Sequence, residues 1–156
     1  MRYLMTLFLG LYFVNAFAAH HGDLDHETTM HVVHAWIKEP LPGMTTSAAY
    51  LMIHNHGTDK DRLIGVSTNI AEFNEIHDMK IEDGVMKMRA ITDGLEIGPD
   101  ERVVFKPGGL HIMLFNLTED LIDGTARVVT LEFEKAGKVN VPALVKKVSR
   151  QTEHHH

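Results

Sequence analysis

Residues 72–91 read EFNEIHDMKIEDGVMKMRAI, two runs of side chains on either side of Asp83-Gly84. Side chains in both runs alternate with the period of two that is typical of β-strands. An Asp-Gly pair between two such runs favours a two-residue hairpin turn. We therefore expect antiparallel strands at 72–79 and 85–91, with His77 brought close to Met86 and Met88.

The same alternation continues from about residue 30 to residue 145, interrupted by turn signals rich in Gly, Pro, Asn and Asp. No sustained helical stripe interrupts it. Eight or nine short strands at roughly even spacing indicate an all-β fold, an antiparallel β-sandwich with Greek-key connections. The expected strands are 30–37, 48–54, 62–67, 72–79, 85–91, 102–106, 110–114, 128–134 and 138–145.

Residues 1–18 resemble a secretory signal peptide. Arg2 supplies a positive start, residues 3–14 are apolar, and Ala16-Phe17-Ala18 fits the small-residue cleavage rule. The apolar run is short for a bilayer core, so we expect export with cleavage near Ala18 and no stable membrane insertion. The predicted parts are the signal peptide at 1–18, a His-rich N-terminal arm at 19–30, one domain at 31–148, and a tail at 149–156 that is either native sequence or a truncated purification tag.

Composition narrows the function. The chain has 21 acidic and 15 basic residues, a formal net charge of −6, and no cysteine. An acidic protein is a poor match for nucleic acid or anionic lipid. Without cysteine it has no disulfide, no lipid attached through an N-terminal cysteine, and no thiolate for a blue-copper electron-transfer centre. Neither a Ser/His/Asp arrangement nor a pair of carboxylates with supporting context indicates catalysis, so we expect a protein that is not an enzyme.

Imidazole and thioether donors are concentrated between residues 77 and 113. The spacing is His77, ten residues, Met88, twenty-two residues, His111, one residue, Met113. Neutral sulfur and nitrogen donors without thiolate suit a soft monovalent ion, and Cu(I) is the obvious one. Any one of these residues alone is more often a core or hydrogen-bonded residue, but together they predict a metal site. Strand parity leaves Met86 as an alternative to Met88, and Met79 and Met86 are otherwise expected in the core or just outside the ligand shell.

A second group of histidines lies near the N-terminus, at His20, His21, His26 and His31. If cleavage leaves Ala19 first, His21 becomes the third residue, which suits Cu(II) chelation by the terminal amine, amides and imidazole. A solvated arm without metal is the equally weighted alternative. We interpret His34, His54 and His56 as structural or surface residues.

Several stretches of this chain resemble the periplasmic copper chaperones written PCu(A)C. They are Ala35-Trp36, Pro40 to Gly43, Ala48 to Gly57, Asp61 to Val66, Glu75-Ile76-His77, Gly84 to Arg89 and Pro107 to Leu114. The resemblance covers roughly residues 30–145, and the combined motif is specific.

The resemblance implies a cupredoxin-like β-sandwich that binds Cu(I) through His77, Met88, His111 and Met113. It also implies a monomeric metallochaperone of the periplasm that delivers copper to the copper centre of cytochrome c oxidase. The implied partners are the oxidase subunit that carries this centre and a thiol-bearing assembly factor. A copper-buffering or resistance protein of the same fold is the alternative function.

Overall fold

A computed structural model of the protein describes residues 29–148, which form ten strands and no helix. The hypotheses on the signal peptide, the histidines before residue 29 and the tail from residue 149 therefore lie outside the described residues. The strands are β1 (Met30–Lys38), β2 (Thr46–Asn55), β3 (Asp61–Ser67), β4 (Ala71–Glu82), β5 (Val85–Ala90), β6 (Leu95–Ile97), β7 (Arg102–Phe105), β8 (His111–Leu117), β9 (Ala126–Phe133) and β10 (Gly137–Lys146).

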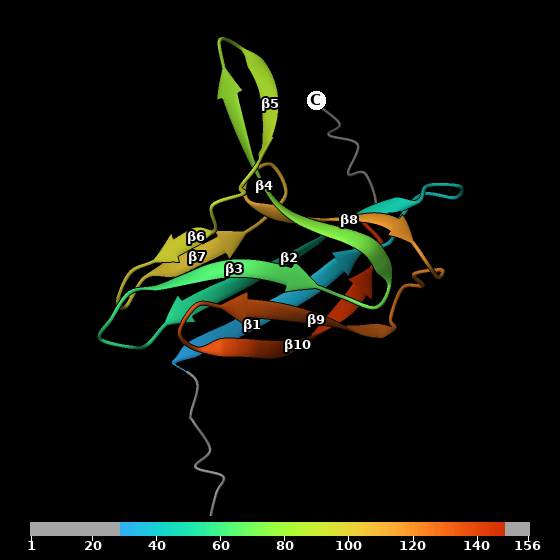
Figure 1. Cartoon of the computed structure of the whole chain (residues 1–156). Helices are drawn as coiled ribbons and strands as arrows, with labels where there is room; N and C mark the ends of the chain where they lie inside the picture. Colours follow the sequence, from blue (N-terminus) through green and yellow to red (C-terminus); the bar gives the residue numbers. More distant parts are fainter. Residues whose placement is uncertain (1–28, 149–156) are drawn as a thin grey trace, which may run out of the picture.

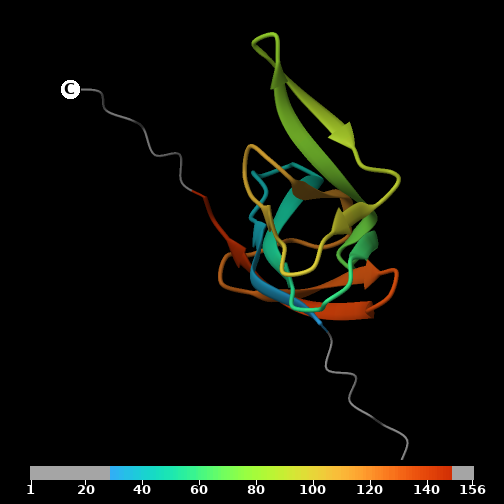
Figure 2. The same cartoon turned by 90° about the vertical axis from the view of Figure 1, so that its left-hand side faces the viewer.

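The strands form one continuous sheet in the order β5-β4-β8-β2-β1-β10-β9-β3-β6, and β7 pairs with β2 beyond its contact with β8. The sheet folds over so that its strands enclose a common interior, as Figures 1 and 2 show from two sides. The expected all-β, cupredoxin-like fold is confirmed, and each of the nine expected strands is present. Two features were not expected: the short strand β6, and the parallel pairing of β1 with β10 in an otherwise antiparallel sheet.

The core is built from alternate side chains of these strands. On β8, Ile112 and Leu114 are fully buried, and on β4 the neighbouring Ile76 packs into the same cluster. Full burial of one such side chain contributes about 1.5–3 kcal/mol. A slip of one residue would turn this set outward, so the core also determines the register of β4 against β8. The residues between them, His77, His111 and Met113, consequently lie on the opposite face of the sheet.

The β4–β5 hairpin projects from the body of the protein (Figure 1). Its turn residues, Asp83 and Gly84, have positive φ angles of 55° and 74°, as a tight two-residue hairpin turn requires. The predicted hairpin is therefore confirmed, although β4 continues to Glu82, three residues past the expected end. Every residue of β5 is exposed.

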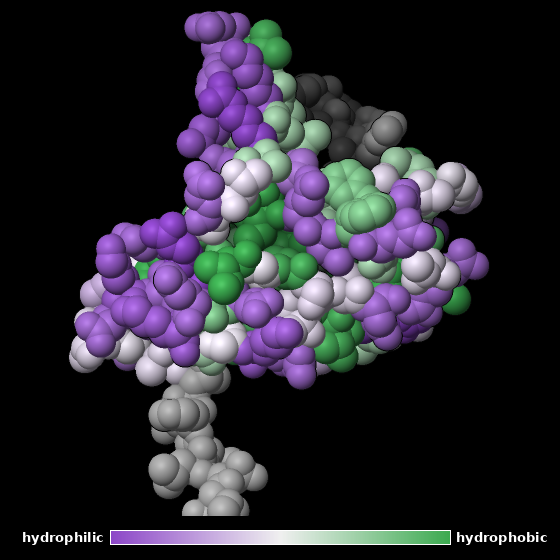
Figure 3. All heavy atoms as spheres, viewed as in Figure 1, coloured by the Kyte–Doolittle hydropathy of each residue, from purple (hydrophilic) through white to green (hydrophobic). Residues whose placement is uncertain are grey.

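The two faces of this hairpin differ in character, and Figure 3 shows hydrophilic residues along one side and hydrophobic residues along the other. On one face Glu82 forms ion pairs with Lys87 at 2.9 Å and Arg89 at 3.0 Å. The register places Met79, Ile81, Met86 and Met88 on the other face, which is the face that carries His77.

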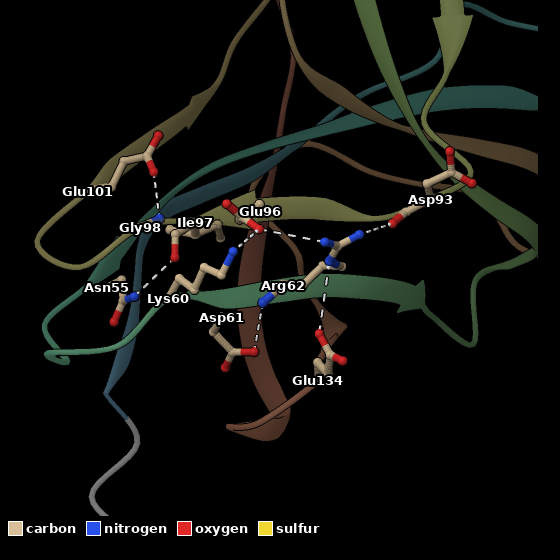
Figure 4. A network of polar contacts seen from close by, with 10 residues as sticks. All are labelled: Asn55, Lys60, Asp61, Arg62, Asp93, Glu96, Ile97, Gly98, Glu101 and Glu134. Atoms are coloured by element: carbon tan, nitrogen blue, oxygen red, sulfur yellow. Dashed lines mark hydrogen bonds and ion pairs between the residues drawn. The ribbon is translucent and has the colours of Figure 1, made fainter.

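A polar network holds the end of the sandwich around β3 and β6 (Figure 4). The buried Asp61 carboxylate accepts hydrogen bonds from the backbone N–H groups of Arg62, Lys135 and Ala136. The fully buried Asn55 side chain donates to the carbonyl oxygens of Asp59 and Ile97 and accepts from Gly57 N–H. These contacts satisfy the buried polar groups and fix the loop after β2.

Within the described residues, no helix is long and apolar enough to cross a membrane.

Candidate metal centre

His77 on β4 and His111 on β8 stand directly opposite each other in the antiparallel register. Their ring centroids are 5.7 Å apart, and the ring planes meet at 60°. His111 is 4% exposed and the His77 side chain is 15% exposed, so both rings are largely shielded from water. The structure thus brings together the two histidines that the sequence nominated from positions 34 residues apart.

Met113 and Glu75 are the next opposed pair on this face, two residues along β8 and β4. Met113 is half-buried and also lines a cavity of about 180 Å³ with Met44 and Tyr50. Its position beside the two histidines agrees with the expected ligand set. The assignment of Met113 as a ligand stays a prediction.

The register also shows how far each of the two candidate methionine ligands on β5 lies from His77. Ala90 stands opposite His77, Met88 opposite Met79, and Met86 opposite Ile81. Met88 is therefore a diagonal neighbour of His77, at the spacing of about 7–8 Å that long side chains can bridge. Met86 lies two residues, or about 7 Å, farther toward the turn. The register favours Met88 over Met86, and both residues are exposed, Met88 at 56% and Met86 at 63%.

Hydrogen bonds indicate which imidazole nitrogens are available to a metal. His111 Nδ1 lies 2.8 Å from the Gly109 carbonyl oxygen, which can only accept, so Nδ1 carries the proton and Nε2 the lone pair. His77 Nε2 lies 2.7 Å from a Glu75 carboxylate oxygen, and His77 Nδ1 is buried without a hydrogen-bond partner among the described residues. Both histidines are thus held at one nitrogen and can offer the other.

The turn before β8 explains how His111 acquires its partner. Gly108 has a φ angle of 79°, which favours glycine, and Lys106 N–H donates to the Leu110 carbonyl across the turn at 2.8 Å. This tight connection leaves the Gly109 carbonyl beside the His111 ring. Pro107-Gly108-Gly109 therefore orients a site residue as well as ending a loop.

The donor set fits a soft ion better than a hard one. Across residues 29–148, no group of three or more His, Asp or Glu side chains is arranged to hold a metal ion. The further donors on the face of His77 and His111 include the thioethers of Met88 and Met113. Two imidazoles and two thioethers suit Cu(I), and the buried, unpartnered His77 Nδ1 is a polar atom that a metal would satisfy.

Glu75 was not among the residues that sequence reasoning nominated. Its position two residues before His77 on one strand was the available signal, because residues i and i+2 share a face.

A second histidine cluster lies elsewhere on the sheet. The ring of His56 stands 3.7 Å from that of His54 and 4.4 Å from that of His31, between ring centroids. His54 is buried and its Nε2 lies 2.8 Å from an Asp100 carboxylate oxygen. This hydrogen bond lowers the pKa of Asp100. The pKa of His56 is also lowered, mainly by loss of hydration and to a smaller extent by the neighbouring His54 and His31. The arrangement agrees with the interpretation of His54 and His56 as structural or surface residues: His54 is buried and His56 is exposed.

Comparisons with known proteins agree with this architecture. Residues 30–145 match a family described as putative lipoprotein LpqE-like. The putative lipoprotein Lxx21020 of Leifsonia xyli subsp. xyli is 30% identical over 121 residues, 78% of this chain and 72% of that protein. The copper-bound PCuAC domain from PmoF2 is 30% identical, with a TM-score of 0.65 over 77% of this chain and 94% of that domain. Apo-DR1885 from Deinococcus radiodurans, 23% identical, shares the fold, with a TM-score of 0.61 over 95% and 97% of the two chains.

Proposed function

This chain belongs to the LpqE-like family, which is the PCu(A)C family, and on that premise we propose that it is a Cu(I) metallochaperone. The observation that carries the proposal is the opposed pair of His77 and His111, each with one nitrogen held by an acceptor and the other available. A structure 30% identical to this chain is described as copper-bound, which supports copper as the metal.

The four proposed ligands are neutral, which explains why such a site can release Cu(I). Thioethers cannot be protonated and favour Cu(I) over harder ions, and the absence of thiolate leaves a site from which copper can pass ligand by ligand to another protein. The proposed ligands are His77, Met88, His111 and Met113. Three of them lie on β4 and β8, and the fourth lies on β5, the edge strand of the sheet. Movement of one exposed edge ligand offers a path for loading and release.

The proposed place of action and the proposed recipient rest on the resemblance to periplasmic copper chaperones and not on the geometry of the site. We place the protein in the periplasm after removal of residues 1–18, as a monomer without enzymatic activity. Its recipient is the copper centre of cytochrome c oxidase, with a thiol-bearing assembly factor as companion. Although the matching family and one relative are described as putative lipoproteins, the 156 residues contain no cysteine to carry a lipid.

Anaerobic Cu(I) titration against a competing chelator tests the site. Single changes to alanine at His77, Met88, His111 and Met113 are each expected to weaken binding, because each removes one donor. Met52→Ala and His34→Asn are matched controls, since Met52 pairs with Val33 and Val104 and His34 is exposed on β1. Equal binding by all four alanine variants and both controls would falsify the proposed site.

Deletion of the gene separates delivery from buffering. Loss of oxidase activity at low copper, restored by added copper, is expected for a delivery protein. Copper sensitivity with intact oxidase activity contradicts delivery and favours the buffering alternative.

A further inference from the structure

We propose that Glu75 is a positioning residue that makes His77 bind copper through Nδ1, while Nε2–H stays hydrogen-bonded to the Glu75 carboxylate. The proposal rests on the proposed function of the site and adds a fifth residue to it. It names the coordinating nitrogen of His77 and the group that selects this nitrogen.

The contact between Glu75 and His77 specifies the proton position. The two side chains are two residues apart on one face of β4, and the carboxylate oxygen is 2.7 Å from Nε2. An ionised carboxylate only accepts hydrogen bonds, so Nε2 must donate. A neutral imidazole then has its lone pair on Nδ1, which is the atom found buried and without a hydrogen-bond partner in the described part of the chain.

The two imidazoles of the site use the same arrangement with opposite nitrogens. His111 donates from Nδ1 to the Gly109 carbonyl and offers Nε2, whereas His77 donates from Nε2 to Glu75 and offers Nδ1. Metal-binding histidines commonly donate their second N–H to a carboxylate or a backbone carbonyl, which fixes the ring and raises its basicity. In this pair, the acceptor for His77 is a carboxylate and the acceptor for His111 is a backbone carbonyl.

Glu75 is better suited to hold a ligand than to be one. A carboxylate is a hard donor that suits harder ions than Cu(I). The Glu75 side chain is 53% exposed, whereas the His77 ring that it contacts is only 15% exposed. Met113 stands opposite Glu75 on β8, so a soft donor is already available at this level of the sheet.

The rival role for Glu75 is a latch that competes with copper for Nε2 and must leave before binding. The two roles predict opposite effects of removing the carboxylate. A positioning residue tightens Cu(I) binding, so its loss weakens the affinity. A latch opposes binding, so its loss strengthens the affinity.

The test compares Glu75→Ala and Glu75→Gln with the parent protein in an anaerobic Cu(I) competition titration. We expect about 10- to 100-fold weaker binding for Glu75→Ala, the usual effect of removing an outer partner of a ligand. Glu75→Gln should lose less, because its amide oxygen still accepts from Nε2–H. Glu72→Ala is the matched control, since Glu72 is also an exposed β4 carboxylate with one hydrogen bond, to Asn116.

Nitrogen-15 NMR of the imidazoles supplies a readout that a purely structural role would not change. In the parent protein, Cu(I) should shift the Nδ1 resonance of His77 and the Nε2 resonance of His111. Without copper, Glu75→Ala should lose the preference of His77 for the Nε2–H form. Unchanged or tighter binding by Glu75→Ala, or a copper-induced shift at His77 Nε2, would overturn the proposal.

Different results would contradict the proposed function and the proposed role of Glu75. If His77→Ala and His111→Ala also bind copper as the parent does, the proposed function itself is wrong. If those variants lose copper while Glu75→Ala keeps it, only the role of Glu75 is wrong.

Discussion

Two groups of histidines lie on the same sheet and differ in what surrounds them. His77 and His111 are opposed across β4 and β8, with methionines on their face of the sheet and a hydrogen-bond acceptor holding each ring. The rings of His31 and His54 instead each lie against the ring of His56, and His54 is hydrogen-bonded to the Asp100 carboxylate. We refer to them as the opposed pair and the histidine cluster.

The difference shows that histidine content alone does not define a copper site. In the opposed pair, the ring centroids are 5.7 Å apart, and the neighbouring side chains on the same face include thioethers. In the histidine cluster, the ring centroids are 3.7 and 4.4 Å apart, so the rings pack directly against one another. The first arrangement suits a soft metal. In the second, loss of hydration and the neighbouring rings lower the pKa of His56.

The largest expected effect separates the two groups by their copper affinity. His111→Ala should weaken Cu(I) binding by more than the roughly 10- to 100-fold cost of losing an outer partner, because it removes a ligand itself. His54→Ala should leave the affinity unchanged. Competition titrations of both variants check this, and a comparable loss in His54→Ala would show that the histidine cluster also contributes to copper binding.

The next comparison lies within the hairpin. Met88→Ala should lose about tenfold in Cu(I) affinity, about 1.4 kcal/mol, because Met88 is the diagonal neighbour of His77. Met86→Ala should stay close to the parent. Loss of affinity in Met86→Ala alone would mean that the β4–β5 register shifts by two residues on binding, or that Met86 is the ligand in place of Met88.

Much of the fold could be predicted from the sequence because its strands obey a period of two and its turns contain Gly, Asn, Asp or Pro. The Asp83-Gly84 turn even implies the register, since a two-residue loop pairs Glu82 with Val85 and hence Met79 with Met88. The strand β6 was missed because three residues, Leu95–Ile97, are too few to show a period. The parallel pairing of β1 and β10 was missed because alternation carries no information on strand direction.

The candidate site, like the fold, could be predicted from the sequence only in part. Residue types and parity sufficed to nominate His77, His111 and Met113, which the structure places on neighbouring positions of one face. The role of Glu75 depends on a side-chain hydrogen bond, which spacing does not predict. The histidine cluster depends on the pairing of His31 with His54 and on the loop held by Asn55, and neither has a local signature.

A smaller effect concerns stability rather than copper. His54→Ala removes a buried ring that contacts the His56 ring and has a hydrogen bond to Asp100, and should lower the free energy of unfolding by about 1–2 kcal/mol. His34→Asn should cost less, since His34 is exposed and has a positive φ angle of 56° that Asn tolerates. Urea denaturation of the metal-free proteins measures both, and equal midpoints would contradict a structural role for His54.

The smallest expected effect is the pH dependence of stability that arises from the histidine cluster. The pKa of His56 is lowered in the folded protein from its ordinary value of 6.5, first by loss of hydration and then by His54 and His31. Below that pH the unfolded chain binds a proton that the folded protein resists, so stability should fall as the pH drops from 7.5 to 5.5. The lowered pKa of Asp100 acts in the same direction but only as the pH approaches and passes below 3.8. His56→Gln should flatten the first decline in urea midpoints, whereas His34→Asn should not. An identical slope in parent and His56→Gln would remove His56 as the group responsible and leave the cluster as packing alone.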